Sequence, residues 1–155
     1  MVEIERKFLL ERVPDWIDAH PSTSIAQGYV AITDDTEVRV RARGQDRLLT
    51  AKGGRGTVRQ EVTVALTVEE FDQLWELTTG RRLTKRRWVV PHDDVEVEID
   101  MFDGHLAGLA VAEVEFPSEA ASAAFAPPEW FGREVTDDPG YRNAALATRD
   151  GPPPA

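Results

Sequence analysis

Cysteine is missing from this 155-residue sequence. Without cysteine the protein has no disulfide bond, no thiolate nucleophile and no zinc site built from cysteine. Histidine is scarce as well, and His20, His92 and His105 lie in predicted loops without the spacing of metal ligands. We therefore assign no histidine to a metal site.

Long apolar runs are absent too. No segment approaches the ~20 apolar residues that span a bilayer, and the first residues lack the apolar stretch of a signal peptide. We expect a cytoplasmic protein without a membrane partner. The glycine-rich segment 53–56 lacks the Gly-Lys-Ser/Thr ending of a phosphate-binding P-loop, so we interpret it as a turn.

Positive charge is in the minority, with 18 Lys and Arg against 28 Asp and Glu and a net charge of −10. This charge repels nucleic acid at long range, so we expect no nucleic-acid partner. A bound polyanion would therefore need a local cluster of basic side chains or bridging metal ions.

Seven or eight segments alternate apolar and polar residues with the period of two that is typical of β-strands. They span residues 2–11, 25–33, 36–43, 47–52, 59–66, 81–90, 95–102 and 109–116. Short turns between them predict an antiparallel meander, and a sheet of that length usually closes or splits. We therefore predict a mainly β (α+β) fold in one domain over residues 1–150, with a disordered tail at 151–155.

Three helices are predicted beside the strands. Thr67 and Glu70 form a capping box, which opens a helix that Gly80 ends. A second, short helix is predicted over residues 118–125, and a third over about 139–149.

Three of the predicted strands carry two carboxylates that are two residues apart and so share one face of the strand. The pairs are Glu3 and Glu5, Glu98 and Asp100, and Glu113 and Glu115. Like charges this close are destabilising unless a cation lies between them. The pairs therefore predict a site for a hard divalent cation bound through oxygen.

Other predicted strands carry mostly basic residues on one face. The basic residues are Arg39, Arg41, Lys52, Arg59, Lys85 and Arg87. Magnesium leaves coordination positions for substrate phosphates, and arginine and lysine bind the other phosphate oxygens. This pattern predicts a polar cavity for a metal and a polyphosphate. A β-sandwich with charged outer faces, paired by cross-strand contacts of about 0.2–1 kcal/mol each, stays open as the alternative.

The segment Glu3-Ile4-Glu5-Arg6-Lys7 matches the Glu-x-Glu-x-Lys signature of the triphosphate tunnel metalloenzymes, also called the CYTH superfamily. Later segments resemble the other family motifs in order: 37–41, Lys52, 59–61, 85–87, 98–100 and 111–116. The chain is most similar to the small bacterial inorganic triphosphatases. The resemblance implies a closed eight-stranded antiparallel β-barrel that forms a tunnel, with a few helices outside, and metal-dependent hydrolysis of a triphosphate.

Charge pattern and resemblance together assign the site residues. The expected ligands of Mg²⁺ or Mn²⁺ are Glu3, Glu5, Glu61, Asp100, Glu113 and Glu115. The expected substrate-binding residues are Arg39, Arg41, Lys52, Arg59, Arg87 and Arg142, and the expected catalytic residues are Lys7, Tyr29 and Lys85. We expect Tyr29 to face Lys7, because a neighbouring ammonium lowers the pKa of a phenol and would prepare it to act as a general base.

Other functions stay open at this point. An organic triphosphate, ATP or thiamine triphosphate, would make the protein a hydrolase or a cyclase. Glu37 stands where an aromatic residue would stack on a thiazolium ring, which disfavours thiamine triphosphate. A non-catalytic polyphosphate-binding module would keep the bases but would not need the carboxylate pairs. The sequence also leaves open whether the protein is a homodimer.

Overall fold

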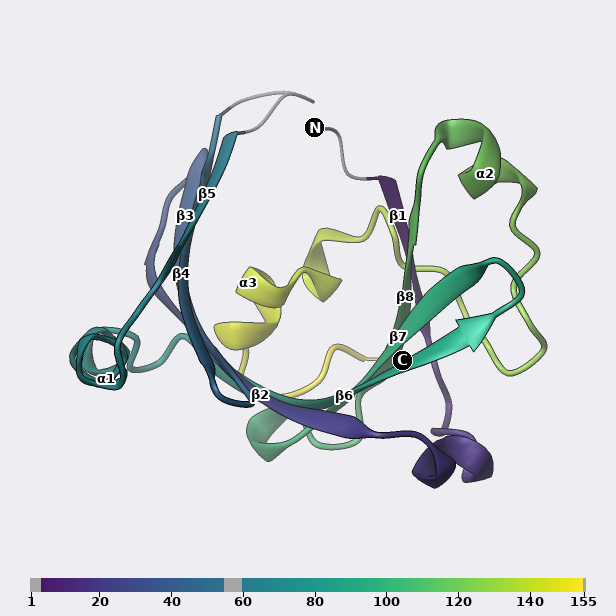
Figure 1. The fold of residues 1–155 in the computed structure, drawn as a ribbon, viewed down its shortest axis with the longest axis horizontal. Helices are drawn as coiled ribbons and strands as arrows, with labels where there is room; N and C mark the ends of the chain where they lie inside the picture. Colours follow the sequence, from purple (N-terminus) through teal and green to yellow (C-terminus); the bar gives the residue numbers. More distant parts are fainter. Residues whose placement is uncertain (1–3, 55–59, 155) are drawn as a thin grey trace.

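The computed structural model of the protein describes residues 4–54 and 60–154. Eight strands of these residues form one antiparallel sheet in the order β1-β8-β7-β6-β2-β3-β4-β5. They are β1 (Ile4–Leu9), β2 (Ser22–Ile32), β3 (Thr36–Arg43), β4 (Asp46–Gly53), β5 (Gln60–Ala65), β6 (Arg82–His92), β7 (Val95–Phe102) and β8 (Ala110–Phe116). The sheet curves into a U, with β2 and β6 at its base (Figure 1). We call its inner surface the concave face and its outer surface the convex face.

The mainly β fold is as predicted, but the strand order is not a meander. Strand β1 pairs with β8, and β2 pairs with β6. The connections explain this order. The 3-10 helix η1 (Asp15–Ala19) joins β1 to β2, and the helix α1 (Val68–Glu76) joins β5 to β6. Each connection buries an apolar residue, Ile17 in η1 and Phe71 in α1, so the two connections are packed elements and not tight turns.

The described residues do not close the sheet by hydrogen bonds, because its edge strands β1 and β5 are not paired with each other. The outer edge of β1 is instead taken by residues 132–135. The Leu9 N–H donates to the Arg133 carbonyl (2.9 Å), and the Leu9 carbonyl accepts from the Gly132 N–H (2.7 Å). The closed barrel expected from the resemblance is therefore not confirmed.

The helices of the described chain are short. The capping box of Thr67 and Glu70 is present at the start of α1. Ser118 caps α2 (Glu119–Ala124), as predicted, and a short 3-10 helix, η2 (Gly104–Leu106), precedes β8. No helix among the described residues is both long enough and apolar enough to cross a lipid bilayer.

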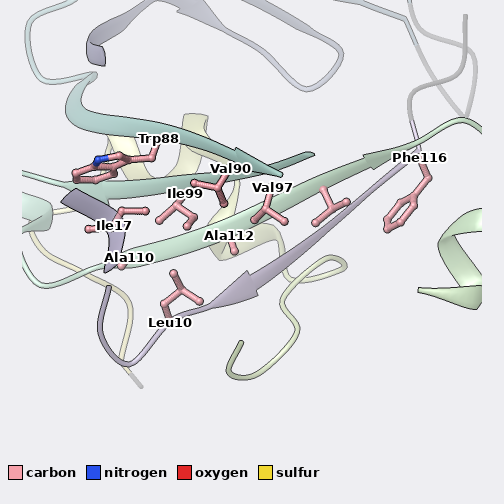
Figure 2. Close-up of a cluster of buried hydrophobic side chains, with 10 residues drawn as sticks. Leu10, Ile17, Trp88, Val90, Val97, Ile99, Ala110, Ala112 and Phe116 are labelled. Carbon is pink, nitrogen blue, oxygen red and sulfur yellow. The ribbon is translucent and has the colours of Figure 1, made fainter. Parts of the chain in front are cut away.

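The convex face of β6, β7, β8 and β1 holds an apolar core (Figure 2). Its buried residues are Leu10, Ile17, Trp88, Val90, Val97, Ile99, Ala110, Ala112, Val114 and Phe116. Phe125, Trp130 and Phe131 pack against this core from the segment that follows α2. The alternation that buries these residues turns their charged neighbours to the concave face.

The C-terminal segment lies inside the U of the sheet (Figure 1). It forms two elements, η3 (Pro139–Tyr141) and α3 (Asn143–Ala147), where the sequence predicts one helix. Leu146 and Tyr141 are buried with Leu83 of β6 and Val111 of β8. The expectation that the helices lie outside the sheet is therefore wrong for α3, because the apolar end of the concave face needs a cover.

Candidate active site

The strand register places the acids and bases on one surface. Tyr29 packs in the same cluster as Leu146 of α3, which lies in the concavity, so residues in register with Tyr29 share the concave face. The register pairs are Tyr29 with Arg39, Gln27 with Arg41, Arg87 with Asp100, Glu98 with Glu113, Lys7 with Glu113, and Glu5 with Glu115. The basic residues of β3 and β6 and the acidic residues of β1, β7 and β8 therefore line one concavity.

Strands β6 and β7 hold a network of ion pairs. Arg87 donates from Nε and Nη2 to the two oxygens of Asp100, at 2.7 and 2.8 Å, and its Nη1 lies 2.9 Å from Glu98 Oε2. Lys85 Nζ lies 2.8 Å from Asp100 Oδ2. Burial opposes ionisation of Asp100, which is only 2% exposed, but Lys85 and Arg87 hold its pKa well below the ordinary value. Both oxygens of Asp100 are thus engaged by cations, so we assign it to positioning them instead of to the metal binding expected from the sequence.

The Lys85 ammonium is fully enclosed. Burial, followed by the charges of Arg87 and Arg41, lowers its pKa to about 8, although Asp100 raises it. Its contact with Asp100 is close, but Nζ has no hydrogen bond of good geometry among the described residues. A second anion beside this ammonium would stabilise its charged form.

Arg39 and Arg41 of β3 differ from Lys85 and Arg87 in their partners. Among residues 4–54 and 60–154, neither Arg39 nor Arg41 forms a salt bridge. Arg41 Nε donates to Gln27 Oε1 at 3.2 Å, and the buried Arg39 Nε has no acceptor among the described residues. Burial, with repulsion from Arg39 and Arg87, lowers the pKa of Arg41 to about 10. This part of the concave face is therefore suited to an external anion.

The expected pair of Tyr29 and Lys7 is absent. Strands β8, β7 and β6 lie between β1 and β2, and the Lys7 ammonium donates to the Tyr141 carbonyl at 3.0 Å. Tyr29 of β2 lies opposite Arg39 of β3 in the register, and burial raises the Tyr29 pKa despite the nearby Arg39. The expected lowering of the Tyr29 pKa by Lys7 is therefore wrong, because the crossover from β1 to β2 separates the two strands.

The carboxylates of β1, β7 and β8 form the acidic side of the concavity. A hollow of about 260 Å³ is lined by residues that include Glu96, Glu98, Glu113 and Glu115. Burial raises the pKa of Glu113, but its interaction with Glu5 and the charges of Lys7, Lys85 and Arg87 lower the pKa by more, so the net shift is downward. Glu113 therefore lies beside a second carboxyl group, and the cations around it favour its charged form.

This donor set fits a magnesium-type ion. Among the described residues, no three His, Asp or Glu side chains are grouped closely enough to hold a metal ion. Mg²⁺, however, is usually bound by one or two carboxylates together with substrate phosphates and water. Glu5 and Glu113, in contact with each other, supply two carboxylates, and Glu115 lies opposite Glu5 in the register. Glu3, another predicted ligand, lies outside the described residues.

The remaining predicted site residues are dispersed. Lys52 and Glu61 pair in the register of β4 and β5, at the opposite edge of the sheet from β1. Glu61 therefore lies on the basic side of the U and away from the carboxylates that it was expected to join. Arg142 is exposed just before α3, and Arg59 lies outside the described residues.

Gln27 and Glu98 belong to the concave face but are missing from the predicted site residues. Gln27 is completely buried between Arg41 and Tyr29. One signal in the sequence points to it, because Gln27 lies two residues before Tyr29 and so shares its face. Glu98 is one of the paired carboxylates, and its contact with Arg87 becomes visible only in the structure.

The sequence and the structure were compared with known proteins, and both comparisons give a consistent result. The model of the CYTH domain matches residues 1–143. An inorganic triphosphatase of Nitrosomonas europaea is 45% identical over 149 residues, covering 95% of this chain and 97% of the relative. An inorganic triphosphatase of Acetivibrio thermocellus is 35% identical over 150 residues, covering 93% and 92%. A crystal structure of an inorganic triphosphatase superposes with a TM-score of 0.77 at 42% identity, covering 96% of each chain.

Proposed function

The chain belongs to the CYTH domain family, and we propose that it hydrolyses inorganic triphosphate to diphosphate and phosphate in the concavity of its sheet. The observation that carries the proposal is the separation of charge on the concave face. Bases of β3 and β6 lie on one part of this face and carboxylates of β1, β7 and β8 on another, with Arg87 close enough to lower the pKa of both Arg41 and Glu113. The full-length likeness to two inorganic triphosphatases supports the choice of substrate.

The basic residues would bind and orient the triphosphate. Arg39 and Arg41 have donors without acceptors among the described residues, and phosphate oxygens satisfy such donors. Lys85 and Arg87 are held by Asp100 and so would stabilise the developing charge with little reorganisation. Phosphoryl transfer depends mainly on this positioning and charge stabilisation.

The carboxylates would hold the metal. We assign Glu5, Glu113 and Glu115 to Mg²⁺ or Mn²⁺, with Glu98 as a further candidate and Glu3 retained from the sequence pattern. A bound divalent ion supplies Lewis-acid polarisation of the phosphoryl oxygens. Arg87 contacts both Glu98 and Asp100, so its side chain links the acidic and basic sides of the concavity.

We further propose that the U narrows to a tunnel when the triphosphate is bound. The charges on the two sides of the concavity are opposite, and a polyanion with its metal would draw them together. Residues 132–135 already occupy the edge of β1 from Lys7 to Leu9, so β5 could pair with β1 only before Lys7. Slower hydrogen exchange of the β5 amides on addition of inorganic triphosphate would support this closure, and unchanged exchange would contradict it.

The test of the function is phosphate release from inorganic triphosphate, ATP, thiamine triphosphate and diphosphate, each with Mg²⁺ or Mn²⁺. We expect inorganic triphosphate to give the highest kcat/KM. Glu119→Gln is the control for substitutions of carboxylates in the site, because this exposed carboxylate lies on α2, outside the concavity. Preference for ATP or thiamine triphosphate would favour an organic substrate, and tight binding without turnover would favour a non-catalytic polyphosphate-binding module.

A further inference from the structure

A chain of hydrogen bonds runs from Arg41 through Gln27 to Tyr29 inside the concave face. Arg41 Nε donates to Gln27 Oε1 at 3.2 Å, and Gln27 Nε2 donates to the Tyr29 hydroxyl at 3.3 Å. A guanidinium can only donate, so the amide atom that faces Arg41 must be the oxygen. This fixes the orientation of the amide and leaves its nitrogen facing Tyr29.

The direction of this chain determines what the Tyr29 hydroxyl can do. Its oxygen accepts from the Gln27 amide, and the nearby Arg39 guanidinium can only donate, so neither neighbour can accept the hydroxyl hydrogen. Among the described residues no acceptor for this hydrogen is present. Burial keeps the phenol protonated by raising its pKa. The hydroxyl is therefore a donor with its own hydrogen still unused.

Gln27 also restrains Arg41. The guanidinium of Arg41 lies near the positive charges of Arg39 and Arg87, which repel it. The Gln27 oxygen is the sole acceptor that Arg41 has among residues 4–54 and 60–154. The other N–H groups of Arg41 therefore remain for an external anion.

We propose that Gln27 is a positioning residue of the concave site: it holds the Arg41 guanidinium and fixes the Tyr29 hydroxyl as a hydrogen-bond donor to a phosphate oxygen. This inference rests on the proposed function for the identity of the substrate. At position 27, a side chain that only accepts would turn the hydrogen of the Tyr29 hydroxyl towards itself. An apolar side chain would leave both the Arg41 guanidinium and the Tyr29 hydroxyl without their hydrogen bond to residue 27. A neutral amide does both tasks because it accepts at one end and donates at the other.

The first test is a double-mutant cycle measured by kcat/KM for inorganic triphosphate. Gln27→Met keeps the length of the side chain but removes both hydrogen bonds, and we expect a loss of roughly tenfold. In a Tyr29→Phe background, Gln27→Met should lower kcat/KM only about threefold, because the Tyr29 hydroxyl is already absent and only the contact with Arg41 is lost. An equal cost of Gln27→Met in the two backgrounds would overturn the link to Tyr29.

A buried substitution can also act by destabilising the fold. Thr78→Val is the control, because Thr78 is completely buried behind Gly28, on the opposite face of β2 from Gln27 and Tyr29. Its hydroxyl donates to the Trp75 carbonyl and accepts from Arg82 Nε, so it takes no part in the hydrogen bonds between Arg41, Gln27 and Tyr29. We expect Thr78→Val to lower the midpoint of urea unfolding without changing kcat/KM. A loss of kcat/KM in Thr78→Val as large as that in Gln27→Met would overturn the proposal.

A second variant keeps the contact with Arg41 but reverses the other hydrogen bond. The carboxylate introduced by Gln27→Glu accepts from Arg41 and can only accept from Tyr29, so turnover should fall although Arg41 stays in place. Full activity of Gln27→Glu would show that the direction of the Tyr29 hydroxyl is irrelevant.

One readout does not depend on turnover. In the protein without substrate, the Arg41 Nε–H should exchange slowly with water in the ¹⁵N NMR spectrum, and this protection should disappear in Gln27→Met but persist in Gln27→Glu. Protection that survives Gln27→Met would overturn the link to Arg41. If this protection behaves as expected but the parent protein does not hydrolyse triphosphate, the proposed function fails and the role of Gln27 in holding Arg41 stands.

Discussion

The two basic regions of the concave face differ in how their charge is compensated. On β6, Lys85 and Arg87 share the carboxylate of Asp100 at distances of 2.7–2.8 Å. On β3, Arg39 and Arg41 contact neutral groups, and no carboxylate of the described residues pairs with them. Lys85 and Arg87 of β6 are therefore held in place by the protein itself, whereas the described residues offer no paired carboxylate to Arg39 and Arg41 of β3.

This difference suggests separate roles for the two basic regions. A buried cation is costly unless it is paired, so β3 keeps a destabilising excess of positive charge that a bound polyanion would relieve. The ion-paired cations of β6 are preorganised and lose little freedom when a substrate enters. We therefore expect substitutions on β6–β7 to affect folding most, and substitutions on β3 to affect substrate binding most.

The largest effect is expected for Asp100→Asn. This change leaves Lys85 and Arg87 buried beside a neutral amide, and the loss of one partner of a buried ion pair costs about 3–5 kcal/mol in the free energy of unfolding. Urea denaturation measures the loss. Asp103→Asn, in an exposed position after β7, is the control and should change stability by less than about 0.5 kcal/mol. An equally small loss of stability in Asp100→Asn would mean that the positive charges of β6 are no better compensated than those of β3.

The next effect concerns the acidic side. Chelation of divalent ions should abolish turnover, and Glu5→Gln or Glu115→Gln should lower kcat by about 100-fold while the fold persists, because an amide lacks the charge of a metal ligand. Metal titrations of turnover in these variants and in Glu119→Gln measure the change. Normal metal-dependent turnover in both Glu5→Gln and Glu115→Gln would contradict the assignment of these carboxylates to the metal.

A smaller effect is expected for Arg39→Ala on β3. We expect kcat/KM to fall by roughly 30-fold, in the range of a lost charge-assisted hydrogen bond. The empty protein should keep its stability or gain up to about 1 kcal/mol, because repulsion within the basic cluster decreases. Arg86→Ala, on the convex face of β6, is the matched control for kcat/KM. If Arg39→Ala unfolds more easily and keeps its activity, this arginine is structural.

The smallest effect is expected for Tyr29→Phe, with a loss of roughly tenfold in kcat/KM. The raised pKa of Tyr29 keeps its hydroxyl protonated below its ordinary pKa of 10.0 and somewhat above it, so it donates throughout the neutral range. The pH profile of the variant should therefore lie lower than that of the parent but keep its shape up to about pH 10. Loss of an alkaline rise in Tyr29→Phe alone would identify the phenolate as a base.

The sequence was sufficient to predict the strands and the faces on which their residues lie. The alternation on residues 36–43 and 95–102 corresponds to β3 and β7, and the capping box at Thr67 marks the start of α1. These features are local, because a period of two and a capping box depend on neighbouring residues alone.

Strand order could not be predicted in the same way. Alternation shows that Lys7 and Tyr29 face the concavity but does not show which strands are neighbours, and the crossover through η1 separates these two residues. For the same reason Asp100 resembles a metal ligand in the sequence, although Lys85 and Arg87 of β6 engage its carboxylate. The position of α3 inside the U depends on packing between residues far apart in the sequence, which a local pattern does not contain.

The most direct test of the central claim is calorimetric titration of inorganic triphosphate into the parent protein, the Arg39→Ala/Arg41→Ala double variant and Arg86→Ala, all in EDTA so that no hydrolysis intervenes. If the β3 arginines are left without carboxylates to receive the substrate, the parent and Arg86→Ala bind with the same Kd, and the double variant binds at least about 100-fold more weakly. Equal Kd values for all three proteins would contradict the account.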